Sequence, residues 1–139
     1  MATSNRPDDN NFASCYDTLG VQRLERLHEE NQVKMVFTGT PQFLNPSGSI
    51  MGGFLSAMLD AALGEVVVNS LSEAESLFTL DIKVSFIAPA RAGKIFAESQ
   101  LIKRGKRVAF SEAQLLDEDG KLVATGSGTF NIYQMTTAE

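Results

Sequence analysis

The chain has 139 residues, of which 43% are apolar and 21% are charged, and this balance excludes a disordered or fibrous protein. Its length fits one domain and leaves no room for two of ordinary size. Seventeen acidic residues against twelve basic ones give a net charge of −5, so we expect no nucleic-acid partner. One cysteine and one histidine exclude an intramolecular disulfide and a zinc site of the usual Cys/His composition.

Residues 1–12 are polar and lack the apolar core of a signal peptide, so we expect a flexible tail there. The longest apolar stretch, residues 54–68, contains three polar side chains and is shorter than the ~20 residues that cross a bilayer. We therefore expect a cytoplasmic protein with no membrane partner.

The first predicted elements are a helix and a strand. Leucines spaced among charged residues predict a short amphipathic surface helix over residues 17–31. Alternating apolar and polar side chains predict a strand over residues 33–38, and a loop rich in turn-forming residues follows at residues 41–49.

Residues 52–68 predict a long buried helix. Only Ser56, Asp60 and Glu65 are polar in this segment, so apolar side chains cover nearly the whole helix circumference. A buried strand is the competing interpretation, but the segment is too long for a typical strand and is rich in helix-forming residues.

Four strands are predicted after this helix, at residues 78–86, 94–102, 107–116 and 122–133. The first alternates throughout, which predicts one buried face and one polar face. The predicted buried face carries Phe78, Leu80, Ile82, Val84 and Phe86, and the polar face carries Thr79, Asp81, Lys83 and Ser85.

Together these elements predict an α+β domain in which a curled antiparallel sheet wraps around the long central helix. One sheet layer cannot cover every side of an apolar helix and its own outer face as well. We therefore expect a homo-oligomer in which dimerisation covers the remaining apolar edge.

Asp60 is the principal candidate for chemistry, because an ionised carboxylate in a buried helix is costly without partners. It is a candidate base or nucleophile. The alternative is a structural role, with Asp60 on a hydrated stripe of the helix or bonded to a nearby amide.

Asn45 and the Gly52-Gly53 pair precede the helix, whose first turn leaves backbone N–H groups unpaired. These donors are suited to stabilising an oxyanion. Taken alone, the glycine pair is better explained by a tight turn that needs a positive φ.

The segment NPSGSIMGGFLSAMLD at residues 45–60 resembles the signature of hotdog-fold acyl-CoA thioesterases of the phenylacetate-pathway, or PaaI-like, type. The similarity continues through residues 79–89, 103–107 and 120–126, and so covers the chain after Val33. It implies a single hotdog domain over residues 1–139, in dimers or tetramers, that releases coenzyme A and a carboxylic acid without a metal or cofactor.

The same resemblance assigns the catalytic roles. Asp60 becomes the carboxylate that activates water or attacks the thioester, and Asn45 and the Gly52 N–H polarise the carbonyl. Thr79 becomes a hydroxyl that positions the water. In this family the site is shared across a dimer interface, so Asn45 and Asp60 need not meet within one chain.

Substrate contacts are implied for Met51, Gly53 and Phe54 beside the helix start. Met51 stands where the family usually has a histidine, which leaves a second interpretation open. In that interpretation the protein is a non-catalytic acyl-CoA-binding domain, a sensor or carrier.

A basic cluster between two predicted strands contains Lys103, Arg104, Lys106 and Arg107. Given the resemblance, we expect Arg104, Lys106 and Arg107 to meet the phosphates of coenzyme A. The alternative is a solvated turn, which is the usual role of a charge run.

Overall fold

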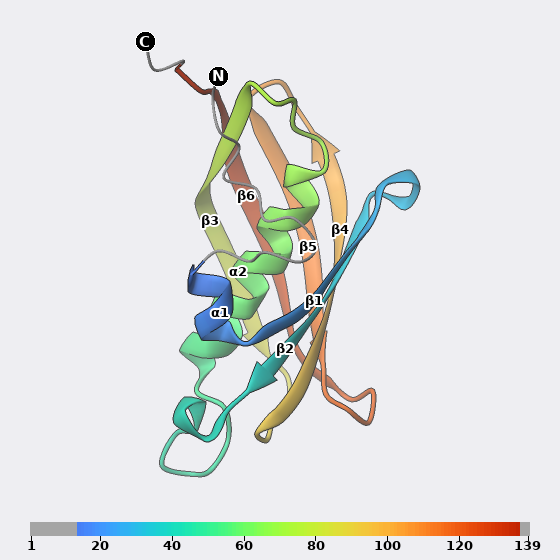
Figure 1. The fold of residues 1–139 in the computed structure, drawn as a ribbon. Helices are drawn as coiled ribbons and strands as arrows, with labels where there is room; N and C mark the ends of the chain where they lie inside the picture. The colour runs from blue at the N-terminus through green and yellow to red at the C-terminus, as the bar shows by residue number, and fades with distance from the viewer. Residues whose placement is uncertain (1–13, 137–139) are drawn as a thin grey trace.

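One antiparallel sheet of six strands curves around a long helix in the computed structural model, which describes residues 14–136 (Figure 1). The strand order is β1-β2-β4-β5-β6-β3, so β1 and β3 form the two edges. In chain order the elements are α1 (Ser14–Leu19), β1 (Val21–Leu27), η1 (His28–Glu30), β2 (Gln32–Gly39), η2 (Pro41–Phe43), α2 (Gly52–Val68), β3 (Glu75–Phe86), β4 (Gly93–Arg104), β5 (Val108–Leu116) and β6 (Leu122–Gln134).

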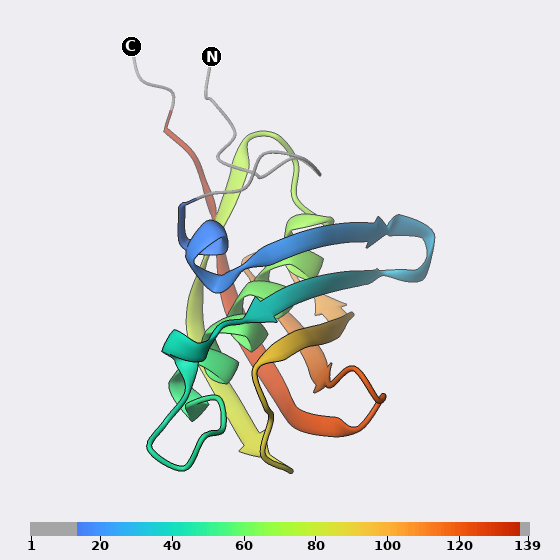
Figure 2. The same cartoon turned by 60° about the horizontal axis from the view of Figure 1, so that its bottom comes forward.

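The central helix α2 is confirmed over the predicted residues, and Figure 2 shows it enclosed in the curve of the sheet. Its side chains fill the core, and Met58, Leu59 and Leu63 are fully buried. Glycines on β6 allow close contact, because a Cβ at Gly126 would lie 3.3 Å from a methyl carbon of Leu59. The expected α+β architecture is therefore confirmed.

The predicted helix over residues 17–31 is wrong. Its first residues are the last residues of the short helix α1. Most of the rest forms β1, an edge strand that pairs with β2. A bulge between Val21 and Arg23 explains the misleading pattern, because it separates the buried residues Val21 and Leu24 by three positions. That spacing imitates a helix turn although the backbone is extended.

The four later strands are confirmed, and the predicted faces of β3 hold from Ile82 onward but are wrong before the bulge. Its register with β6 shifts between Thr79 and Asp81, which makes Leu80 the extra residue of a bulge. In the pairing with β6, Ile82 lies opposite Gly128 and Thr79 lies opposite Phe130. The Phe130 ring is fully buried on the helix side of the sheet. Thr79 therefore faces α2, whereas Phe78 and Leu80 are each about half exposed.

A buried ion pair attaches the N-terminal elements to α2. Glu65 is only 4% exposed. Its carboxylate forms an ion pair of 2.6 Å with Arg26 of β1 and accepts a hydrogen bond of 2.5 Å from the Tyr16 hydroxyl of α1. Arg26 also donates to Asn69 at 2.8 Å. Burial and the adjacent carboxylate raise the pKa of Tyr16 far above its usual range, so its hydroxyl stays a donor.

The expected tail, residues 1–12, lies outside the described residues. Within residues 14–136, no helix has both the length and the apolar character needed to span a membrane.

Candidate active site

Two backbone donors are open at the start of α2. Met51, the residue before the helix, provides no side-chain cap, and its carbonyl accepts the N–H groups of Phe54 and Leu55. Within the described part of the chain, the N–H groups of Gly52 and Gly53 have no hydrogen-bond acceptor. The first turn of α2 therefore presents two donors at the positive end of the helix dipole.

Asn45 lies in the loop before the helix, and its side chain is held in one orientation. Its Oδ1 accepts the Ser47 N–H at 2.9 Å, the Ser49 N–H at 3.2 Å and the Ser49 hydroxyl at 3.4 Å. These donors fix the amide oxygen toward the loop, which leaves the Nδ2 group as a donor directed elsewhere. Ser47 and Ser49 are positioning residues that the sequence analysis missed, although Asn-Pro-Ser-Gly-Ser is a typical turn signal.

The loop is attached to the helix start by the backbone and by a ring contact. The Met51 N–H donates to the Phe43 carbonyl at 2.8 Å, and Leu44 pairs with Ile50 across the loop. The Phe43 and Phe54 rings stack with centroids 4.2 Å apart. Phe54, expected to contact substrate, is thus half-buried against Phe43 and holds the loop near Gly52.

Asp60 lies two turns further along α2, on the helix stripe that the sheet leaves partly uncovered. Its Oδ1 accepts a hydrogen bond of 2.9 Å from the Thr79 hydroxyl. This contact joins the two residues that the sequence assigned to water activation. It also shows the bulge's effect, because regular alternation would have turned Thr79 to the outer face.

The structure joins Thr79 to Asp60 by a hydrogen bond, and it keeps this pair apart from Asn45 and Gly52. Asn45 and Gly52 lie at the start of α2, and Asp60 and Thr79 lie beside the middle of the helix. Gly52 and Asp60 are eight residues apart, or about 12 Å along a helix that rises about 1.5 Å per residue. One thioester carbonyl cannot meet both groups of a single chain.

The basic cluster lies at the opposite end of the sheet from Gly52, in the hairpin between β4 and β5. Arg104 is engaged there, since its guanidinium contacts Glu75 at 2.7 Å and donates to the carbonyls of Gly105 and Lys106. Lys106 and Arg107 are exposed. The pKa of Glu75 lies below its usual value. The main cause is the hydrogen bond that its carboxylate accepts from the Ser72 backbone N–H, and the second is the hydrogen bond from Arg104.

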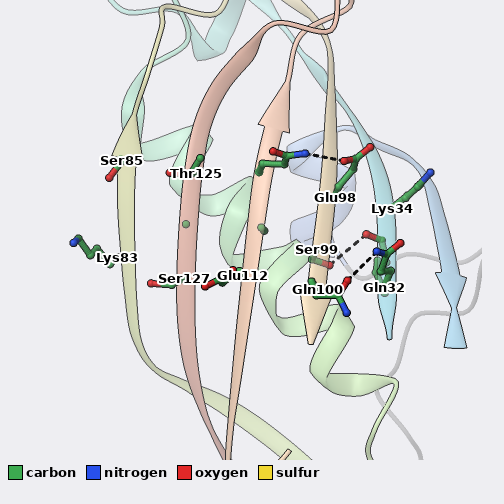
Figure 3. Close-up of a pocket in the computed structure, with 14 residues that line it drawn as sticks. Gln32, Lys34, Lys83, Ser85, Glu98, Ser99, Gln100, Glu112, Thr125 and Ser127 are labelled. Carbon is green, nitrogen blue, oxygen red and sulfur yellow. Dashed lines mark hydrogen bonds between the residues drawn. The ribbon is translucent and has the colours of Figure 1, made fainter. Parts of the chain in front are cut away.

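A hollow of about 620 Å³ lies on the outer face of the sheet, away from α2 (Figure 3). None of the predicted site residues lines it. Polar side chains of neighbouring strands line it and are linked by hydrogen bonds. The Gln114 amide donates to the Glu98 carboxylate, and the Gln32 amide donates to the Gln100 side-chain oxygen, each at 2.8 Å. Across residues 14–136, no three His, Cys, Asp or Glu side chains converge as metal ligands would.

The sequence and the fold were compared with known proteins. Residues 47–124 match the model of the thioesterase superfamily. The chain is 30% identical over 129 residues to the medium/long-chain acyl-CoA thioesterase YigI of Salmonella typhimurium, and the match covers 82% of each protein. YigI of Escherichia coli matches to the same extent.

Solved structures give the same result. A phenylacetic acid degradation-related protein from Ralstonia eutropha JMP134 superposes with a TM-score of 0.82 and 34% identity, covering 86% of this chain and 90% of that one. The PaaI protein of Escherichia coli shares the fold, with a TM-score of 0.77 at 21% identity. The sequence match and the fold agree, and the chain belongs to the thioesterase superfamily as a hotdog-fold member of the PaaI-like type.

Proposed function

We propose that the protein hydrolyses acyl-CoA thioesters, with Asp60 as the general base and the Gly52 N–H and Asn45 Nδ2 groups as the oxyanion donors. The hydrogen bond between Thr79 and Asp60 carries this proposal, because it fixes a carboxylate on an incompletely covered stripe of an otherwise buried helix. The family match and the YigI relatives, which are named as medium/long-chain acyl-CoA thioesterases, support the reaction class.

The proposed reaction uses one water molecule. Asp60 takes a proton from the water as its oxygen attacks the thioester carbonyl carbon. The oxyanion that forms accepts hydrogen bonds from the Gly52 N–H and Asn45 Nδ2 groups. The C–S bond then breaks, and the proton held by Asp60 passes to the departing sulfur, which yields coenzyme A and the carboxylic acid.

The distance between the two pairs of site residues supports a site that is shared with a second copy of the chain. Strand β3 is an edge strand, and its side chains Phe78, Leu80 and Phe86 are each more than half exposed. Such an edge is suited to antiparallel pairing with the same strand of another protomer. We therefore include a homodimer through β3 in the proposal.

The site geometry also sets the register of that pairing. Phe86 contacts the chain at Gly52, and Thr79 contacts Asp60, so these two β3 residues mark the levels of the two half-sites. Asp60 meets the oxyanion donors of the other protomer when Thr79 of one copy lies level with Phe86 of the other. Because Leu80 is looped out, Asp81 is then level with Ser85 and the two-fold axis passes at Lys83.

The same dimer gives the basic hairpin a role. Arg104 contacts Glu75, the first residue of β3, so the hairpin lies at the Thr79 end of that strand. Antiparallel pairing brings this end to the Gly52 end of the other protomer. Exposed Lys106 and Arg107 are thereby placed to bind the phosphates of coenzyme A, whereas Arg104 is held in its ion pair. Met51 and Gly53 remain proposed substrate contacts beside the thioester.

The test is the release of free coenzyme A from short, medium, long and aromatic acyl-CoAs by the wild type and by Asp60→Asn. We expect turnover by the wild type and a loss of at least ~100-fold in the variant, as for removal of a general base. Circular dichroism confirms that both proteins are folded. Stoichiometric binding of acyl-CoA without product by the wild type would overturn the proposal in favour of a binding domain.

A further inference from the structure

Two apolar side chains lie beside Gly52 and Gly53, the residues that carry the open donors of α2. A Cβ built on Gly52 would lie 2.9 Å from Cζ of Phe86, and one built on Gly53 would lie 3.2 Å from Cε of Met51. The three atoms nearest to the Gly52 Cβ position all belong to the Phe86 ring. The glycine pair thus lies between an aromatic ring and a thioether.

Both side chains are also open to solvent. Phe86 is 55% exposed and Met51 is 51% exposed, and Ile87, next to Phe86, is 54% exposed. Phe86 holds this position because β3 ends there beside Ala124 of β6, on the helix side of the sheet. Exposed apolar side chains of this size around unpaired backbone donors indicate a binding surface for an apolar group of a ligand.

We infer that Phe86, with Met51, selects the acyl group by excluding polar substituents near the thioester carbonyl. The inference rests on the proposed function, because the donors at Gly52 locate the carbonyl. When the thioester carbonyl is bound at these donors, the first carbons of the acyl chain must lie against the Phe86 ring or the Met51 thioether. An alkyl chain loses no hydrogen bonds against these groups, whereas a hydroxyl on the third carbon loses its bonds to water.

The substrate class is therefore acyl-CoA with an unsubstituted apolar chain, and 3-hydroxyacyl-CoA is rejected. An apolar wall rejects an added hydroxyl by up to about 100-fold. We expect kcat/KM to favour hexanoyl-CoA over 3-hydroxyhexanoyl-CoA by about 10-fold or more in the wild type.

The experiment compares this ratio in the wild type, Phe86→Ala and Phe86→Leu. We expect Phe86→Ala to bring the ratio within about threefold of unity and Phe86→Leu to keep most of it, because leucine remains apolar. Phe110→Ala is the matched control, since Phe110 is an exposed phenylalanine of β5 outside the proposed site. It should leave the ratio unchanged.

Dissociation constants of the non-hydrolysable thioether analogues of both compounds are measured in parallel. If Phe86→Ala leaves the ratio of kcat/KM values, or the ratio of dissociation constants, for the two compounds unchanged, the role of Phe86 is overturned even if the wild type is an active thioesterase. Binding that discriminates between the analogues without turnover of either thioester would overturn the proposed hydrolysis and leave the selectivity standing.

Discussion

The Thr79 hydroxyl reaches Asp60 because Leu80 is looped out of register in β3. Beyond the bulge, Ile82 and Val84 face the helix at even positions, and before it Thr79 faces the helix at an odd one. One extra residue in an edge strand thus converts an apparent outer-face threonine into the partner of a helical carboxylate. Bulges beside active sites re-aim side chains in this way.

Thr79 is expected to act as a positioning residue for Asp60. Replacing Thr79 by Ala frees the carboxylate to rotate, so we expect kcat to fall by roughly 10-fold with little change in KM. Thr79→Ser retains the hydroxyl and should recover most of the rate. Steady-state kinetics on one acyl-CoA decide the point, and equal losses in the Ala and Ser variants would contradict it.

Mixing two inactive variants tests whether the site is shared between protomers. Asp60→Asn and Asn45→Ala remove groups that we assign to opposite protomers, so a mixed dimer keeps one complete site. Random re-association of equal amounts should restore about a quarter of the wild-type rate. Activity is followed after denaturation and refolding of the mixture. No recovery above the separate variants, despite mixed dimers by native mass spectrometry, would place the whole site in one chain.

The buried ion pair at Glu65 is expected to matter for stability. Glu65→Ala leaves Arg26 without its carboxylate partner at a largely buried position, so the free energy of unfolding should fall by about 3 kcal/mol. A combined Tyr16→Phe, Arg26→Met, Glu65→Leu variant removes every charge and should recover most of the loss. Urea unfolding at one protein concentration measures both. A loss under about 1 kcal/mol in Glu65→Ala would show that the pair is not a main attachment of β1.

Glu75 predicts a pH dependence of stability. Its pKa in the folded protein lies below the usual 4.5, so its contribution is complete above that value and is lost as pH falls through the folded pKa. Glu75→Gln should therefore lower stability at pH 7 and flatten its decline on acidification. Glu73→Gln, at an exposed neighbouring position, serves as the control. Parallel pH curves for the wild type and Glu75→Gln would refute this role.

The sequence predicted α2 to its first and last residue because a run of apolar side chains has one stable placement, inside the sheet. The roles of Asp60, Asn45 and Gly52 stay predictions, to which the structure adds the hydrogen bond between Thr79 and Asp60. The prediction missed β1 and gave the wrong faces to the first half of β3 for one physical reason. Bulges at Gln22 and Leu80 change which face a side chain occupies, and no residue type announces such a shift.

The order of strands has a consequence for how the chain is made on the ribosome. Strand β3 pairs with β6, the last of the six to be synthesised, and Glu75 lies opposite Gln134. Until β6 emerges, β3 has no neighbour in the sheet, and the apolar helix before it lacks one of its walls. Nascent chains arrested before residue 122 should therefore bind chaperones that recognise exposed apolar segments, and should lose that binding once β6 is released.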